Sequence, residues 1–126
     1  EISGDDFFTD MFETALEDGE IVTAVRFPKP IRAGYAKFPN PASRYAIVGV
    51  LAAETADGTR ITVTGAGACV FRASAMEAAL GKTLSSDTEL PAISPEGLNS
   101  DMHASAEYRA HLVAVMAKRA IKSAIA

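Results

Sequence analysis

Cysteine, tryptophan and positive charge are scarce in this chain of 126 residues. Its one cysteine, Cys69, cannot form an internal disulfide, so an intracellular, cytoplasmic setting is the simplest expectation. The formal net charge of -4 provides no basic surface for phosphate backbones, and we expect no nucleic-acid partner. Because no apolar run approaches the roughly 20 residues of a membrane span, the sequence predicts no transmembrane segment.

The residues that are present have the composition of a globular domain. Hydrophobic residues make up 48% of the chain and charged residues 22%, a balance that argues against disorder and against fibrous structure. A chain of this length can bury one core. Since it begins at Glu1 rather than at methionine, we expect residues 1–126 to be a single domain of a longer chain.

Short alternating segments predict a small antiparallel sheet. Apolar residues alternate over 21–27, which predicts a first strand, and a second short strand is expected over 34–38. The apolar run 45–54 and the alternating run 61–64 are separated by turn residues 56–59, and this pattern is typical of a hairpin. The aromatic stretch that precedes these strands is too apolar for us to expect it in water.

Helix signals follow the strands. Ser74 and Glu77 have the spacing of a capping box and predict a short helix that ends at Gly81. Ser94 and Pro95 favour one further helical turn.

The last helix is expected to open at Asp101 or Ser105 and to cover the core. Its Arg109 and Arg119 project onto or beside the apolar stripe, where they either snorkel or pair with carboxylates of a neighbouring domain. Strands that precede helices indicate an α+β fold, with a small antiparallel sheet of three to four strands packed on about three helices.

The loop after Lys37 is the most informative segment for function. Pro39 and Pro41 restrict its backbone, so Lys37 and Arg44 are expected at fixed positions. An ordinary stiff connection between strands is the other interpretation.

Other chemistry is poorly supported. His103 and His111 have no cysteine or paired carboxylates at ligand spacing, so we predict no metal site, and no catalytic residue is indicated. Gly65 and Gly67 begin like a dinucleotide fingerprint, but Val70 occupies the position of the third glycine. The two glycines instead suit a bulge or a close backbone approach, or tight packing of sheet on helix. With the aromatic stretch 7–16 and the proline loop, they could form half of a pocket for a flat ligand.

Several segments, in this order, resemble the C-terminal domain of the flavoprotein medium subunits of molybdenum hydroxylases, the family of aerobic carbon monoxide dehydrogenase and xanthine dehydrogenase. The resemblance covers nearly the whole chain and is greatest for the carbon monoxide dehydrogenase-like branch. The segments that carry it are Phe7–Leu16 with Gly19–Pro28, Lys37–Tyr45, Gly65–Gly67 with Phe71–Ala73, and Asp101–Arg109.

The resemblance implies a role beside FAD. In that family, electrons pass from a molybdopterin large subunit, through the 2Fe-2S clusters of a small subunit, to FAD in the medium subunit. The FAD pyrophosphate is held by the preceding N-terminal FAD-binding domain of the same subunit, whose glycine-rich loops this sequence lacks. We therefore expect no FAD on the 126 residues alone and no catalysis by them.

The same resemblance assigns candidate cofactor-binding residues. Met11, Phe12 and Thr14 would lie near the isoalloxazine ring. Lys37 and Arg44 would lie beside it on the proline loop. The alternative hypothesis is a non-catalytic protein-interaction or assembly domain, whose loop and exposed arginines dock a partner protein.

Overall fold

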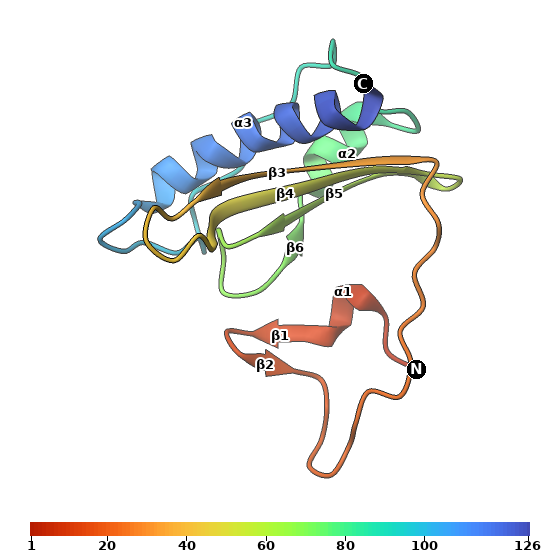
Figure 1. The fold of residues 1–126 in the computed structure, drawn as a ribbon, viewed down its shortest axis with the longest axis vertical. Coiled ribbons are helices and arrows are strands. Elements are labelled where there is room, and N and C mark those ends of the chain that lie inside the picture. Colours follow the sequence, from red (N-terminus) through yellow and green to blue (C-terminus); the bar gives the residue numbers. More distant parts are fainter.

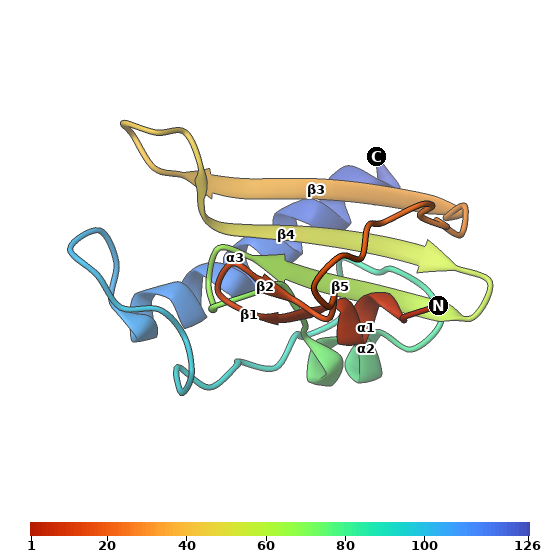
Figure 2. The same ribbon diagram turned by 90° about the horizontal axis from the view of Figure 1, so that it is seen from below.

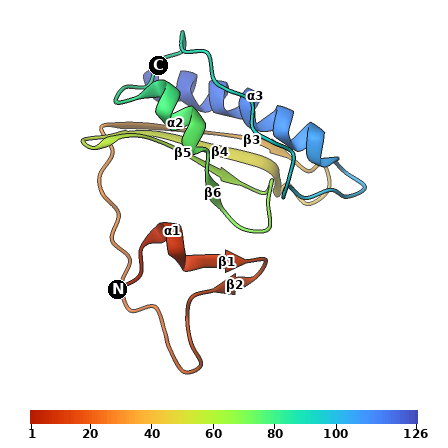
Figure 3. The same ribbon diagram turned by 180° about the vertical axis from the view of Figure 1, so that it is seen from behind.

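The structure is a computed structural model that describes residues 1–126, and it has two parts: a sheet covered by helices, and an N-terminal arm formed by residues 1–31 (Figure 1). The sheet is antiparallel, with its four strands in the order β3-β4-β5-β6. Both long helices cover one face of this sheet, and the arm lies on the other side (Figures 1 and 3). This arrangement confirms the predicted α+β fold. The strands are β3 (Arg32–Pro39), β4 (Ala46–Thr55), β5 (Gly58–Thr64) and β6 (Phe71–Arg72).

The β4–β5 hairpin forms where the turn residues predicted it. Thr55 pairs with Gly58 across a two-residue turn, and the Thr55 Oγ1 hydroxyl donates to the Gly58 carbonyl at 2.8 Å. Gly58 has a φ of 132°, which a residue with a side chain rarely adopts. The strand expected over 34–38 is also confirmed, within the longer β3.

The core lies between the sheet and helices α2 (Ser74–Leu80) and α3 (Ala106–Ile125). Helix α3 can approach β3 closely because Gly34 has no side chain: a Cβ there would collide with the backbone of Ala120 and Ala124. The largest fully buried side chains are those of Val48, Val50, Thr59, Ile61, Val63, Met76, Val113, Met116 and Ile121.

Two of the helix-start predictions differ in outcome. Ser105 caps α3, because its side chain accepts a hydrogen bond from the Tyr108 amide at 3.2 Å. The predicted capping box of α2 is wrong, since Ala73 is the N-cap and no side chain caps that helix. Glu77 is unavailable for capping because its carboxylate accepts the Ile61 amide and pairs with Arg72.

Two further predictions concern the end of α2 and a helical turn at Ser94 and Pro95. Helix α2 ends at Gly81 as predicted, with a φ of 68° and its amide donating to the Glu77 carbonyl. The helical turn expected at Ser94 and Pro95 is only a turn, which the Leu98 amide closes by donating to the Pro95 carbonyl at 3.1 Å.

The arm contains a short helix and a two-stranded ladder, and none of its residues is buried. Seen from below, the arm crosses the open face of the sheet (Figure 2). The expectation that its aromatic stretch is shielded from water is therefore wrong for this chain, and Phe12 is fully exposed. The arm's elements are α1 (Gly4–Phe7), β1 (Phe8–Asp10) and β2 (Glu13–Thr14).

The strand predicted over 21–27 does not form. This segment has no regular secondary structure, and its apolar side chains are exposed, with Phe27 at 85%. A strand needs a neighbour for its backbone amides and carbonyls, and no element of the sheet or arm lies paired with it. None of the helices combines the length and the hydrophobicity that crossing a membrane requires.

Candidate functional site

The β3–β4 loop is closed by its own hydrogen bonds. The Asn40 amide donates to the Tyr45 carbonyl at 2.7 Å, and the Arg44 amide donates to the Asn40 carbonyl at 2.9 Å. The Asn40 side chain accepts from the amides of Ala42 at 2.9 Å and Ser43 at 3.2 Å. The loop is therefore ordered by Asn40 as well as by its prolines. Sequence reasoning missed this residue, although asparagine is a common turn former.

Lys37 and Arg44 meet at this loop. The Lys37 Nζ donates to the Arg44 carbonyl at 3.0 Å, which uses one of the three ammonium donors and leaves two. Arg44 has a φ of 65°, a conformation that costs a non-glycine residue roughly 1 kcal/mol and that the surrounding hydrogen bonds maintain. The Arg44 guanidinium is exposed and has no hydrogen-bond or ion-pair partner. The structure thus brings these two predicted residues together.

Met11, Phe12 and Thr14 lie together in the arm, at the turn and second strand of the β1–β2 hairpin. Phe12 has a φ of 60° and is fully exposed, and Met11 is 49% exposed. This turn and the β3–β4 loop extend toward the same end of the molecule in both side views (Figures 1 and 3). None of the five predicted cofactor-binding residues lines either of the two cavities described below.

A polar cavity of about 200 Å³ lies beside the β3–β4 loop, and the buried Arg109 forms part of its wall. Arg109 Nη1 donates to the carbonyls of Ile47 at 2.7 Å and Gly65 at 3.1 Å, and its Nη2 donates to Asp101 Oδ2 at 2.8 Å. Both sequence interpretations of Arg109 are wrong: it does not snorkel, and its carboxylate partner belongs to the same domain. Arg119, by contrast, is exposed.

Asp101 links this cavity to the start of α3. Its carboxylate accepts the amides of His103 at 2.9 Å and Ala104 at 3.0 Å. These two bonds, followed by the charge of Arg109, hold the pKa of Asp101 below its ordinary value. Asp101 therefore stays ionised and orders the turn before the helix, although it does not open the helix itself.

Other residues of the same domain contact the backbone of Gly65 and Gly67, which follow β5. A Cβ on Gly65 would collide with the Ala46 carbonyl, so the close backbone approach inferred for this segment is made by β4. The Gly67 carbonyl accepts from Asn99 Nδ2 at 2.8 Å, and Gly67 forms a bridge with Leu98.

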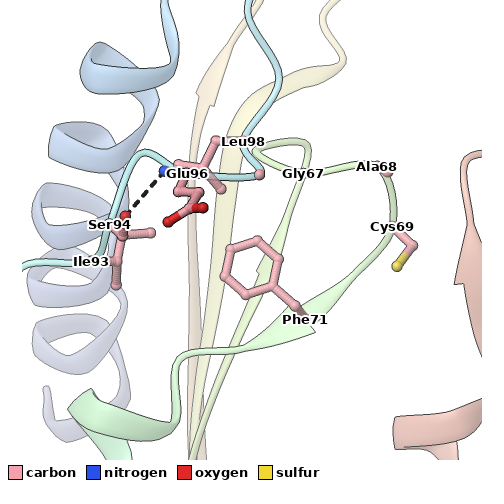
Figure 4. Close-up of a pocket in the computed structure, with 9 residues that line it drawn as sticks. Gly67, Ala68, Cys69, Phe71, Ile93, Ser94, Glu96 and Leu98 are labelled. Atoms are coloured by element: carbon pink, nitrogen blue, oxygen red, sulfur yellow. Dashed lines mark hydrogen bonds between the residues drawn. The ribbon is translucent and has the colours of Figure 1, made fainter.

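A second cavity, of about 330 Å³, is lined in part by Gly67 (Figure 4). The Phe71 ring faces it, and its rim includes the turn in which the Glu96 amide donates to Ser94 Oγ at 3.1 Å. Cys69, half-buried, is the only thiol there. No group of three or more histidine, cysteine, aspartate or glutamate side chains in the structure could hold a metal ion.

The family of this chain follows from sequence comparison. Residues 33–124 match the family described as the CO dehydrogenase flavoprotein C-terminal domain. The chain belongs to this family. The match begins within β3, so that the arm lies outside it.

Individual members agree with the assignment. The chain is 34% identical to the nicotine 6-hydroxylase medium subunit of Paenarthrobacter nicotinovorans, over 98% of this chain and 47% of that subunit. Quinoline 2-oxidoreductase from Pseudomonas putida 86 superposes with a TM-score of 0.77 at 26% identity, over 98% of this chain and 47% of that one. CO dehydrogenase from Oligotropha carboxidovorans superposes with a TM-score of 0.75 at 24% sequence identity, over 95% of this chain and 46% of that one. The chain thus spans about half the length of these relatives, which are oxidoreductases or their subunits.

A CO dehydrogenase flavoprotein domain implies a flavin, and the residues here fit only part of FAD. The exposed Met11 and Phe12 suit an apolar ring face, and the free N–H groups of Lys37 and Arg44 suit carbonyl acceptors at a ring edge. A phosphate needs free backbone amides or a cationic cradle. Gly65 cannot supply one, because the Ala46 carbonyl lies too close even for a Cβ there.

Proposed function

We propose that this domain forms one side of the FAD pocket in the flavoprotein subunit of a molybdenum hydroxylase. There it supports electron transfer from iron-sulfur clusters, through FAD, to an acceptor. The observation that carries the proposal is the pairing of an exposed apolar turn, Met11 and Phe12, with an ordered cationic loop, Lys37 to Arg44, at one end of a domain of this family.

The exposed arm supports a preceding FAD-binding domain as the first partner. Ile21, Val25 and Phe27 are 78%, 65% and 85% exposed, and clustered apolar side chains of this kind usually mark a surface that another structure covers. An FAD shared between that domain and this one would have its phosphates held there and its ring flanked here. A small iron-sulfur subunit and a molybdopterin large subunit complete the proposed assembly.

Each predicted residue has a physical task in this site. Met11 and Phe12 would cover an apolar ring face and limit the access of solvent to it, and Thr14 lies on the strand that supports them. The cations of Lys37 and Arg44 would favour negative charge on the ring edge that faces them. FAD, when bound, supplies one- and two-electron redox chemistry.

The decisive experiment uses the complete flavoprotein subunit loaded with FAD. Lys37→Gln removes the charge but keeps a donor for the Arg44 carbonyl, so it should lower the flavin reduction potential by roughly 30 mV without loosening the loop. Phe12→Ala should change the flavin absorbance spectrum. The matched controls Lys29→Gln and Ile31→Ala are exposed residues of the arm outside both the proposed site and the surface assigned to the preceding domain, and they should change neither.

Unchanged spectra and potentials in Lys37→Gln and Phe12→Ala would overturn the proposed site. That result would favour the alternative, a non-catalytic interaction or assembly domain, which the exposed apolar arm also suits.

The 126 residues by themselves offer an independent test. Because they contain no phosphate cradle, calorimetry at about micromolar protein should detect no FAD binding. Tight stoichiometric binding would contradict the division of the site between two domains.

A further inference from the structure

The arm and the core are joined by one side-chain ion pair, between Asp5 in α1 and Arg72 in β6. Arg72 Nη1 donates to Asp5 Oδ2 at 2.8 Å. The only other polar link is the Ile31 amide at the end of the arm, which donates to the Glu54 carbonyl at 2.7 Å. Helix α1 lies below β6 in both side views (Figures 1 and 3). Arg72 therefore supplies the one side-chain polar contact that holds residues 1–30 beneath the sheet.

Arg72 is held from the core side before it meets the arm. Its Nε donates to Glu77 Oε1 at 3.0 Å, and its Nη2 donates to Glu77 Oε2 at 2.5 Å. The Glu77 carboxylate is 9% exposed and also accepts the Ile61 amide at 2.9 Å, which fixes it against β5. This two-bond geometry leaves Nη1 directed at the arm, so little further side-chain freedom is lost when Asp5 binds.

The electrostatics also rank the contact of Arg72 with Glu77 above its contact with Asp5. The hydrogen bonds that Arg72 donates to Glu77, followed by the one it donates to Asp5, raise the pKa of Arg72 above its already high ordinary value. The arm contact is thus the outer and weaker half of one ion-pair network.

We propose that Arg72 is a positioning residue that fixes the arm beneath the sheet and so keeps Met11 and Phe12 at the same end of the molecule as the Lys37–Arg44 loop. The consequence for FAD rests on the proposed function, but the arm contact itself involves no cofactor. In the complete subunit, Arg72 would set how the two sides of the flavin ring are aligned.

Hydrogen-deuterium exchange of the 126-residue chain tests the contact directly. Asp5→Asn removes the charge on the arm side and leaves the Arg72–Glu77 pair in place. Amides of residues 4–14 should then exchange about threefold faster, the size expected for a partly exposed ion pair. Asp6→Asn is the matched control, since the Asp6 side chain accepts only from Ser3 Oγ, at 2.8 Å, and forms no ion pair with the core.

Two further measurements test the same contact between Asp5 and Arg72. About 1 M sodium chloride should reproduce the effect of Asp5→Asn, because it screens exposed charges. Arg72→Gln should also loosen the arm, and adding Asp5→Asn to it should change arm exchange no further. Unaltered exchange in β4 and α3 shows that the core has kept its fold in each variant.

The outcomes separate this proposal from the proposed function. Arm exchange unchanged in Asp5→Asn, equal loosening in Asp6→Asn, or additive effects of Asp5→Asn and Arg72→Gln would each overturn the positioning role of Arg72. Loosening in Asp5→Asn supports that role even if Phe12→Ala and Lys37→Gln leave the flavin unchanged, a result that would overturn only the flavin site.

Discussion

The sheet-and-helix core and the N-terminal arm are both rich in apolar side chains, but only the core buries them. In the core, Val48, Val113 and Met116 are at most 1% exposed because α3 packs against β3 and β4. In the arm, Phe8 and Val25 are 47% and 65% exposed, and one short ladder is its only sheet structure.

Apolar content does not by itself build a core. Burial requires two complementary surfaces, and the four-stranded sheet offers one to the helices while the arm offers none of comparable size. The same lack of a partner makes the arm available to another domain, which is the basis of the proposed flavin pocket. Three comparisons of matched residues test this difference between the core and the arm.

The largest difference is expected between two methionine truncations. Met116→Ala removes a side chain that is 1% exposed and should lower the free energy of unfolding by about 2–5 kcal/mol. Met11→Ala removes one that is 49% exposed in the arm and should change it by less than about 0.5 kcal/mol. Urea unfolding followed by circular dichroism measures both. Equal losses would show that the arm shares the packing of the core.

A smaller difference is expected between two glycines. Gly34→Ala places a Cβ against the backbone of α3, so the helix must move, at a cost of about 1–3 kcal/mol. Gly4→Ala meets nothing within 4 Å and should leave the melting temperature nearly unchanged. Thermal unfolding of the two variants checks this. A tolerated Gly34→Ala would mean that α3 is not held closely on β3.

The smallest difference concerns stability in acid. The Leu84 amide at 2.8 Å, and then the Arg32 guanidinium, hold the pKa of the buried Glu54 below its ordinary value. A carboxylate of this kind stabilises the fold above its unfolded pKa, and the stabilisation is lost as pH falls through the lower folded pKa.

Glu54→Gln should therefore lower the melting temperature at neutral pH and flatten its decline below about pH 4.5. The arm control Glu13→Gln is exposed and makes no side-chain hydrogen bond, so it should leave the pH profile unchanged. Melting temperatures measured across the acid range decide the point. A profile of Glu54→Gln as steep as that of the unchanged chain would remove Glu54 from the acid response.

Local signals in the sequence predicted the parts of the fold whose partners are nearby in the chain. The β4–β5 hairpin follows from two apolar runs joined by a two-residue turn, and α3 follows from helical spacing behind the Ser105 cap. The segment 21–27 has an equally regular alternation but does not pair, because alternation specifies a face and not a neighbour.

The candidate site also has a part that was predictable from nearby residues and a part that was not. Lys37 and Arg44 are seven residues apart across a turn, so their proximity was predictable, although the Lys37 bond to the Arg44 carbonyl was not. Arg109 was recognised only as an unusual charge on an apolar stripe. Its acceptors include the carbonyls of Ile47 and Gly65, which only the assembled sheet brings to the helix.

The hairpin, the last helix and the family could be inferred from the amino-acid sequence, because turn chemistry, helical spacing and ordered segments are properties of neighbouring residues. The packing of distant segments settles which apolar segments are buried, which acceptors the Arg109 guanidinium binds, and that Arg72 joins the arm to the core. These outcomes depend on which surfaces meet, since burial and ion pairing are free energies of contact between segments distant in the chain.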